Sequence, residues 1–297
     1  MKRQCAGGLL ALFGTLAGVP LSAQGYSAQE CPPCAGWNAT RAPVKLFGNS
    51  YYVGTDGLSA ILITSPAGHV LIDGGLPESA PKILQSITAL GFRVQDVKLI
   101  LNSHDHYDHV GGIAELARAS GATVAASPSS AVTMRNGRSG PNDPQFGLLL
   151  PFPKVTRVET VADGDTLRVG PLAVVAHFTP GHTAGGTSWS WRSCEASVCL
   201  DMVYADSQTP ISDATFRYTG DARYPTAVAD FSRGHSVLEQ LRCDVLLTPH
   251  PAASKLWERL ASTDAAAGLK DAEGCKRYAA TGRAALERRL AAERAKP

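Results

Sequence analysis

The sequence predicts an α/β protein built as a four-layer αβ/βα sandwich, in which two sheets pack face to face and helices cover their outer faces. Strand-like and helix-like segments occur in two similar halves, each with its strands first and its helices later. No low-complexity tract or linker divides the halves. With 297 residues, of which 44% are apolar and 18% charged, the chain can bury a large core. We therefore expect residues 24–297 to form one domain.

The first half is expected to begin with a sheet of short strands, because turn residues separate its apolar segments. These strands are expected at residues 44–47, 51–53, 58–63 and 70–72. A helix follows, since Ile83, Ile87 and Leu90 share one face and Gly91 ends the pattern. The half is completed by a strand at 97–101, a helix near 113–117 and a strand at 122–126.

The second half follows a long loop. Residues 136–153 contain several Gly and Pro, and loops of that length in compact domains are usually functional. Gln145 and Phe146 on this loop, and the later Phe216 and Tyr218, are candidates for groove walls, although the aromatic rings could belong to the core. Further strands are expected at residues 156–161, 166–169, 172–178, 187–191 and 198–204. A helix at 225–241, a strand at 245–247 and a helix from Cys275 complete the pattern.

The first residues have the layout of a secretory signal peptide. Positive charge at Lys2 and Arg3 precedes an apolar run of small and aliphatic residues, which closes with Ala23. We expect residues 1–23 to be removed as a signal peptide and the protein to reach the periplasm, or to be released from the cell. A membrane anchor is the alternative, but the apolar run is short and rich in Gly.

Charge limits the partners. The formal net charge is +2, and removal of Lys2 and Arg3 would balance the 26 acidic residues with an equal number of basic ones. A neutral chain argues against nucleic acid or an anionic membrane as the main partner. We expect a monomer that binds a small-molecule substrate, with no nucleic acid and no membrane as partner.

The cysteines indicate disulfides. Apart from Cys5 in the expected signal peptide, an even number remains, as is typical of exported proteins. Cys194 and Cys199 bracket a short polar segment and are expected to clip a hairpin, and Cys243 and Cys275 to tie a strand to the C-terminal helix. Cys31-Pro-Pro-Cys34 is a redox pair or a local staple, and the absence of a surrounding βαβ unit favours the staple.

The stretch from Asn102 to Gly112 carries the chemistry. It places three histidines and two carboxylates between an apolar strand and a Gly-Gly pair. Neutral imidazole nitrogens and a carboxylate are the ligands that zinc ions prefer. On an extended segment, His104 and His106 share a face and can bind one ion together. Asp108 and His109 follow where the chain turns, and can face a second ion. A chance polar cluster is the alternative, but charged histidines this close repel one another.

Two more histidines stand at the ends of apolar strands. His182 follows Thr179-Pro-Gly, and His250 lies between two prolines. A core histidine bonded to a backbone carbonyl is the usual alternative, yet a two-ion site still needs about one more protein ligand per ion. We therefore assign the candidate metal ligands, which are also the candidate catalytic residues, in two sets. The first zinc takes His104, His106 and His182, and the second takes Asp108, His109 and His250. We interpret His69, His177 and His235 as structural or surface residues.

These motifs resemble the metallo-β-lactamase superfamily along most of residues 44–250. The resemblance narrows to the third subclass of class B (zinc) β-lactamases, whose second zinc uses one aspartate and two histidines. Tyr204-Ala-Asp-Ser207 has serine where another subclass carries a zinc-binding cysteine. Gly181-His182-Thr183 precedes Gly-Gly-Thr-Ser-Trp, and cysteines flank Thr248-Pro-His250-Pro. The family fold is the four-layer αβ/βα sandwich.

The resemblance implies hydrolysis of the β-lactam amide of penicillins, cephalosporins and carbapenems by a metal-bound hydroxide, and hence antibiotic resistance. It implies two Zn²⁺ per chain, with Asp108 orienting the hydroxide. It also implies that Asp73 supports the metal-binding loop without binding metal. Ser207, and less surely Thr209, would hydrogen-bond the substrate carboxylate.

Two alternatives of different kinds remain. One is an exported dizinc hydrolase of another ester, lactone or thioester, in which Asp206 would bridge the metals. Those hydrolases have Gly-Asp at this place, whereas Ala205 precedes Asp206 here, so we favour a structural role for Asp206. The other is a zinc-storing or metal-sensing protein without catalysis.

Overall fold

The fold was analysed in a computed structural model, which describes Met1 and residues 26–27, 29–262 and 265–295. The expected signal peptide, apart from Met1, lies outside the described residues. Two mixed sheets form the centre of the described part, in the strand orders β1-β2-β3-β4-β5-β6-β7 and β12-β11-β10-β9-β8. The first sheet consists of β1 (Val44–Phe47), β2 (Ser50–Tyr52), β3 (Ile61–Ile63), β4 (His69–Ile72), β5 (Val97–Leu101), β6 (Thr123–Ala126) and β7 (Glu159–Thr160). The second consists of β8 (Thr166–Val169), β9 (Leu172–Phe178), β10 (Thr187–Glu195), β11 (Val198–Tyr204) and β12 (Val245–Leu247).

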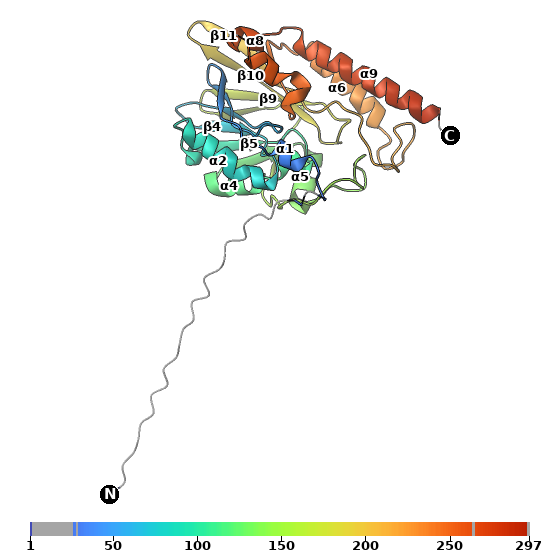
Figure 1. Ribbon diagram of the computed structural model, residues 1–297, viewed down its shortest axis with the longest axis horizontal. Helices are drawn as coiled ribbons and strands as arrows, with labels where there is room; N and C mark the ends of the chain where they lie inside the picture. The colour runs from blue at the N-terminus through green and yellow to red at the C-terminus, as the bar shows by residue number, and fades with distance from the viewer. Residues whose placement is uncertain (2–25, 28, 263–264, 296–297) are drawn as a thin grey trace.

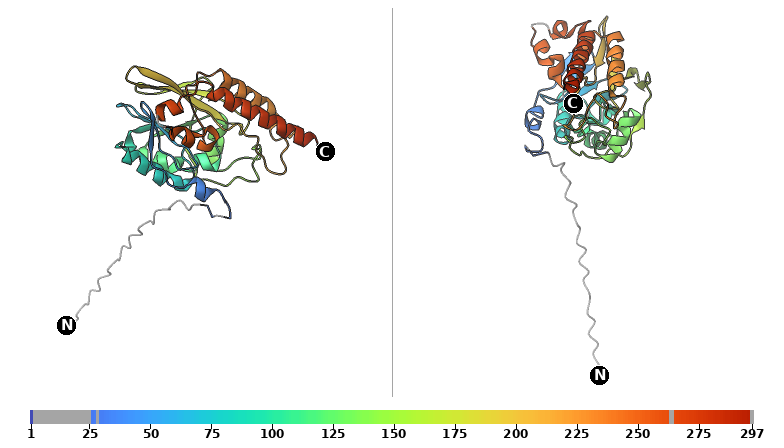
Figure 2. Two further views of the ribbon diagram at one scale, coloured as in Figure 1. Left: turned by 45° about the horizontal axis from the view of Figure 1, so that its top comes forward. Right: turned by 90° about the vertical axis from the view of Figure 1, so that its right-hand side faces the viewer.

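Helices cover the outer faces of both sheets. The α-helices are α1 (Cys34–Trp37), α2 (Ala80–Ala89), α3 (Tyr107–Val110), α4 (Ile113–Ser120), α5 (Pro128–Asn136), α6 (Ala227–Gln240), α7 (Leu256–Leu260), α8 (Ala265–Leu269) and α9 (Gly274–Arg294). Short 3₁₀ helices lie at η1 (Pro77–Ser79), η2 (Val94–Asp96) and η3 (Pro251–Ser254). Figure 1 shows α2 and α4 on one side of the sheets and α6 and α9 on the other. The views in Figure 2 agree that α6 and α9 run side by side.

Three apolar layers hold this arrangement together. Between the sheets, Tyr52, Trp189 and Tyr204 belong to one continuous buried cluster. A second cluster packs α2, α4 and α5 onto the first sheet, and smaller clusters lie under α6 and α9. Each sheet therefore buries both faces, and the predicted αβ/βα sandwich is confirmed.

The two halves meet so that the ends of their strands share one edge. Strands β4, β5, β6 and β7 are parallel neighbours, and β11 and β12 pair in parallel. The carboxyl ends of β5, β9 and β12 lead directly into the stretches that contain the six candidate ligands. The fold thus carries residues that are distant in sequence to a common place.

Some local expectations differ from the structure. The strand expected at 156–161 is only Glu159–Thr160, because α5 binds the preceding segment: Val155 N–H donates to Met134 and Arg135 donates to the carbonyl of Val158. Helix α5 was not predicted, although Ser127 accepts a hydrogen bond from Ser130 N–H and Pro128 occupies the first turn. The short helices α1, α7 and α8 were also not predicted from the sequence.

Three disulfides link the cysteines within the described residues. Cys194 and Cys199 face each other across the β10–β11 hairpin, and Cys243 and Cys275 join the approach to β12 with α9. Cys31 and Cys34 also pair, three residues apart, which agrees with the local staple. Among the described helices, none has both the length and the apolar character needed to cross a bilayer.

Candidate metal centre

The six candidate ligands converge in two adjacent groups. We call His104, His106 and His182 the first triad, and Asp108, His109 and His250 the second triad. Within each triad, one potential ligand atom per residue lies within 4.8 Å of those of the other two residues. The ring centroids of His104 and His109 are 4.4 Å apart, so the triads share a wall. The fold therefore places two groups of potential metal ligands side by side.

Local structure aims the first two histidines. After β5 a short irregular segment with a bend leads to His106, which has β-region backbone angles at the start of α3. The short helix α3 then directs Asp108 and His109 toward His250, with which they form the second triad. Gly111 and Gly112 follow, and an added side chain at Gly112 would lie 2.3 Å from the carbonyl oxygen of Gly74. Gly112 therefore permits close packing of residues 102–112, which we call the metal loop, against the segment that follows β4.

Each imidazole of the first triad is held by its outer nitrogen. His104 Nδ1 lies 2.8 Å from Asp206 Oδ1, and His106 Nε2 lies 2.9 Å from Asp143 Oδ2. His182 Nδ1 lies 2.8 Å from the carbonyl oxygen of Thr209. An acceptor on the outer nitrogen fixes the ring and leaves the inner lone pair for a metal, as in carboxylate–histidine–zinc arrangements.

The second triad is held less tightly. His250 Nδ1 lies 3.2 Å from the carbonyl oxygen of Gly57, and Trp37 packs on the ring at 5.1 Å between centroids. His109 Nδ1 is 3.9 Å from Asp73 Oδ2, beyond hydrogen-bond range. Asp108 Oδ2 lies 3.3 Å from the Nε2 atoms of both histidines. Within the described part of the chain, neither ring nitrogen of buried His109 has a hydrogen-bond partner, which is costly unless a cation occupies the site.

Asp73 holds the metal loop through hydrogen bonds to Ser103. Its carboxylate accepts hydrogen bonds from Ser103 N–H and Ser103 Oγ–H, each 2.7 Å long, and from the Tyr204 hydroxyl at 2.8 Å. Its backbone has a φ of 63°, an unusual conformation for a residue other than Gly. Asp73 belongs to neither triad and lies where the resemblance places a supporting aspartate.

The electrostatics suit metal binding. Burial, together with the neighbouring His109, lowers the pKa of His104 well below its usual range, and burial lowers that of His182 to about 3. Burial opposes ionisation of Asp108, but His109 and His250 hold its pKa well below the usual value. At neutral pH His104 and His182 are therefore neutral and Asp108 is ionised, the protonation states that zinc binds. Burial opposes protonation of His106, but the neighbouring Asp143 carboxylate raises the pKa of this histidine.

Two carboxylates contact imidazoles of the first triad: Asp206, for which the sequence favoured a structural role, and Asp143. Asp206 stands behind His104 and is not among the groups that converge in the triads. Asp143, from the long loop, was not singled out at all. The only sequence signal for Asp143 is its position two residues before Gln145, which was a candidate for the groove wall. Gln145 does reach the site, with its Nε2 3.3 Å from His182 Nε2.

The candidate substrate contacts lie on the loop after β11. Ser207 is nearly buried, and its hydroxyl has no protein hydrogen-bond partner within the described part of the chain. Thr209 is exposed, and its Oγ1 lies 3.5 Å from His182 Nδ1. The backbone carbonyl of Thr209, rather than its hydroxyl, makes the shorter contact with His182. The other three histidines lie outside both triads, with His235 and His69 buried.

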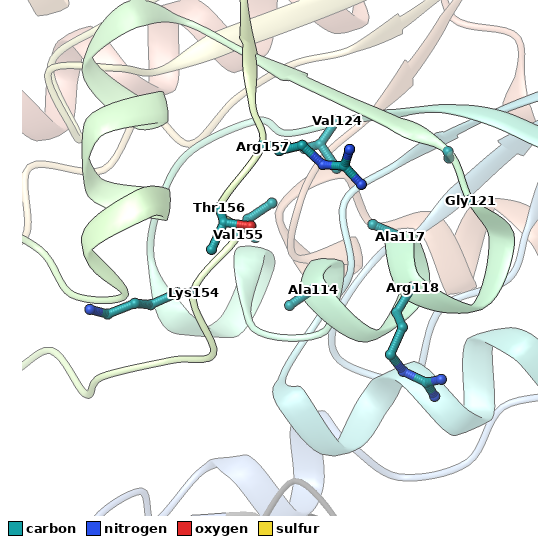
Figure 3. Close-up of a pocket in the computed structure, with 10 residues that line it drawn as sticks. Ala114, Ala117, Arg118, Gly121, Val124, Lys154, Val155, Thr156 and Arg157 are labelled. Carbon is teal, nitrogen blue, oxygen red and sulfur yellow. The ribbon is translucent and has the colours of Figure 1, made fainter.

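A separate pocket lies at the opposite end of the first sheet. Figure 3 shows it between α4 and residues 154–157, lined by Arg118, Lys154 and Arg157 together with small apolar side chains. It borders the amino end of β6, whereas the metal loop follows the carboxyl end of the parallel strand β5. Among the described residues, no histidine or carboxylate lines it.

Comparison with known proteins agrees with this geometry. A family model described as the metallo-beta-lactamase superfamily matches residues 53–262. The chain is 52% identical to the Rm3 metallo-beta-lactamase, covering 89% of this chain and 99% of that one with a TM-score of 0.87. It is 48% identical to MEM-A1, a subclass B3 metallo-beta-lactamase isolated from a soil metagenome library, covering 88% and 100% of the chains with a TM-score of 0.86.

Curated relatives carry a different name. The hydroxyacylglutathione hydrolase of Bradyrhizobium sp. (strain ORS 278) is 29% identical over 162 residues, which is 54% of either chain. The enzyme of the same name from Rhodospirillum rubrum is 27% identical over 129 residues, 43% of this chain and 41% of that one. The chain therefore spans about half the length, or less, of these curated relatives.

Proposed function

The chain belongs to the metallo-beta-lactamase superfamily, and from this premise we propose that it is a zinc-dependent β-lactamase. Its substrates would be penicillins, cephalosporins and carbapenems, and its activity would confer antibiotic resistance. The observation that carries the proposal is the pair of triads, each with three potential ligand atoms in one small space. The similarity to subclass B3 β-lactamases over nearly their whole length supports the same substrate class.

The donor set fits two zinc ions. The first triad would hold one ion through three imidazoles, and the second triad would hold the other through two imidazoles and a carboxylate. When bound, two neighbouring zinc ions would lower the pKa of a water to near neutrality and polarise the lactam carbonyl. Three protein ligands per ion leave a coordination position open, as catalytic zinc sites require and structural or storage sites do not.

The remaining roles fall to side chains around the triads. Asp108 would accept a hydrogen bond from the attacking water and so orient it, since its buried carboxylate is kept ionised. Ser207 would donate its otherwise unpaired hydroxyl to the substrate carboxylate, and Thr209 would do so from the open side. The amide of Gln145 lies beside His182 and would contact the substrate from the long loop.

The decisive experiment combines metal analysis with a substrate panel. Purified protein should contain about two zinc ions and hydrolyse a chromogenic cephalosporin, a penicillin and a carbapenem. A chelator should abolish hydrolysis, zinc should restore it, and serine-directed inhibitors should leave it unchanged. Hydrolysis that persists in fully metal-stripped protein contradicts the proposal.

The curated relatives favour one competing function, hydrolysis of a thioester. A bridging aspartate at Asp206 would support that function, but the Asp206 carboxylate lies behind His104 and bonds its outer nitrogen. This position favours the lactamase. The same panel with an acyl-glutathione thioester and a lactone separates the two, because fast thioester or lactone turnover without β-lactam turnover would establish the competitor.

We further propose that the protein acts as a monomeric domain, residues 24–297, in the periplasm after removal of residues 1–23. Mass spectrometry of the protein from a periplasmic extract would identify its first residue. A species that retains residues 1–23 in the cytoplasm contradicts export. Light scattering tests the monomer.

A further inference from the structure

The loop of residues 137–153, which follows α5, contacts the first triad through one turn, at Asp143 and Gln145. Although Phe146 and Leu148 on this loop are exposed, at 44% and 57%, Asp143 is buried at 6%. Its Oδ2 lies 2.9 Å from His106 Nε2, and its Oδ1 accepts a hydrogen bond of 2.7 Å from the backbone N–H of Gln145. A single carboxylate therefore contacts a candidate ligand with one oxygen and shapes its own loop with the other.

The two bonds have linked consequences. An ionised carboxylate accepts only, so His106 donates through Nε2–H and its Nδ1 lone pair is left facing the triad. The bond to Gln145 N–H closes a tight turn, and that turn directs the Gln145 side chain to His182. The same carboxylate thus sets the orientation of one first-triad imidazole and the approach of a loop side chain to another.

We propose that Asp143 is a positioning residue that couples the order of the 137–153 loop to metal binding at the first triad. A metal at the first triad fixes the His106 ring, which holds Asp143 and therefore the turn that presents Gln145. Conversely, a loop that has left the site removes the acceptor from His106 and weakens the metal site. The coupling is reciprocal, as linkage between two binding events requires.

A second anchor on the same loop provides the matched control. Asp213 accepts a hydrogen bond from Gly147 N–H through Oδ2, and its backbone N–H donates to the carbonyl of Pro144. Its other oxygen is used by Thr215 and Phe216, and it contacts no residue of either triad. Loss of Asp213 therefore loosens the loop without removing the acceptor of His106.

The test compares Asp143→Asn with Asp213→Asn. The two bonds of Asp143 use different oxygens, and in asparagine an NH2 donor replaces one of them, so one of the two acceptors is lost. Stepwise zinc affinities are measured by competition with a chromogenic chelator, and amide hydrogen exchange reports the order of residues 140–149. Asp143→Asn should weaken zinc at the first triad by about 10- to 100-fold, the usual effect of losing the partner of a ligating histidine.

Asp213→Asn should speed exchange at Gly147, where its hydrogen bond is lost, while the turn that holds Asp143 on His106 stays closed. Zinc affinity should therefore change by less than about threefold, well under the loss expected for a histidine partner. Unchanged zinc affinity in Asp143→Asn, or an equal loss in both variants, overturns the proposal. A further measurement needs no variant: zinc added to the metal-free protein should slow exchange at Gln145 and Phe146, and unchanged exchange contradicts the coupling. The inference rests on the metal centre alone, since no readout involves a β-lactam, so it can fail or hold independently of the substrate class.

Discussion

The two triads are adjacent, yet the protein holds their side chains in different ways. In the first triad, every outer imidazole nitrogen meets a carboxylate or carbonyl oxygen within 2.9 Å. In the second, the corresponding contacts are 3.2 Å for His250 and 3.9 Å for His109. The His250 side chain is 31% exposed, whereas that of His104 is 1% exposed. The difference indicates a preorganised first site and a more adaptable second one.

This contrast has a physical consequence for metal affinity. A ring already fixed by its outer partner loses little freedom when it binds a metal, and an anionic partner raises the basicity of the ligand. We therefore expect the first triad to retain its metal longest during chelation. The second triad would exchange its metal more readily, and the partial exposure of His250 suits a site that also contacts substrate.

The largest effect should come from replacing one ligand in each triad. His104→Ala should lower kcat/KM for a cephalosporin by about 10³-fold or more, equivalent to roughly 4 kcal/mol of transition-state stabilisation. His250→Ala should reduce the zinc content from two ions toward one and lower kcat/KM less severely. Elemental analysis and steady-state kinetics on the same samples measure both. If His250→Ala keeps both ions, the sixth ligand is another residue.

A smaller effect should come from the outer partners. Asp206→Ala removes the acceptor of His104 Nδ1 and should weaken the first zinc by about 10- to 100-fold. Trp37→Ala removes only a packed ring from His250 and should weaken the second zinc by a few-fold, the order of a lost aromatic contact of about 1 kcal/mol. Chelator competition gives both affinities. Equal losses would mean that the triads do not differ in preorganisation.

The sequence predicted the candidate metal ligands much better than the side chains that hydrogen-bond to them. The layers follow from hydrophobic periodicity, and the ligands follow from residue types that few other sites need, so both could be predicted. Asp143 could not, because an aspartate in a Pro-rich loop has no local signature, and its role depends on where the loop folds back. Asp206 was assigned a structural role, but its contact with His104, 102 residues earlier in the chain, is a product of the tertiary fold. Helix α5 was missed because its apolar face is weak and its signal lies in the cap at Ser127.

Ser207 gives a third comparison, between a residue such as Asp206, which holds a candidate metal ligand, and a residue that is expected to contact the substrate. Because the Ser207 hydroxyl has no protein partner in the described residues, its removal should leave zinc content and stability unchanged. Ser207→Ala should raise KM by about tenfold, as expected for the loss of one hydrogen bond to a charged group. Kinetics on a penicillin measure this. An unchanged KM would assign the carboxylate to another group, with Thr209→Ala as the next variant.

The smallest expected effect on activity concerns a histidine outside both triads, and it separates acid sensitivity of the fold from acid sensitivity of the metal site. His235 is fully buried on α6, and among the residues that the structure describes neither of its ring nitrogens has a hydrogen-bond partner. An added side chain at Gly282 of α9 would lie 2.7 Å from its Nε2. Burial, and then the Arg283 guanidinium, lowers the pKa of His235 to about 4, while Glu239 opposes this shift.

Because the folded pKa of His235 lies below the unfolded value of about 6.5, the unfolded chain takes up the proton first as the pH falls. The stability linked to neutral His235 is therefore complete above pH ~6.5 and is lost between pH ~6.5 and ~4, at a rate approaching about 1.4 kcal/mol per pH unit. His235→Leu should remove this slope. Urea unfolding of the zinc-saturated wild type and variant at pH 7.5, 6 and 5 measures the difference. Parallel curves would mean that the acid lability arises from the triads themselves, where protonation competes directly with metal binding.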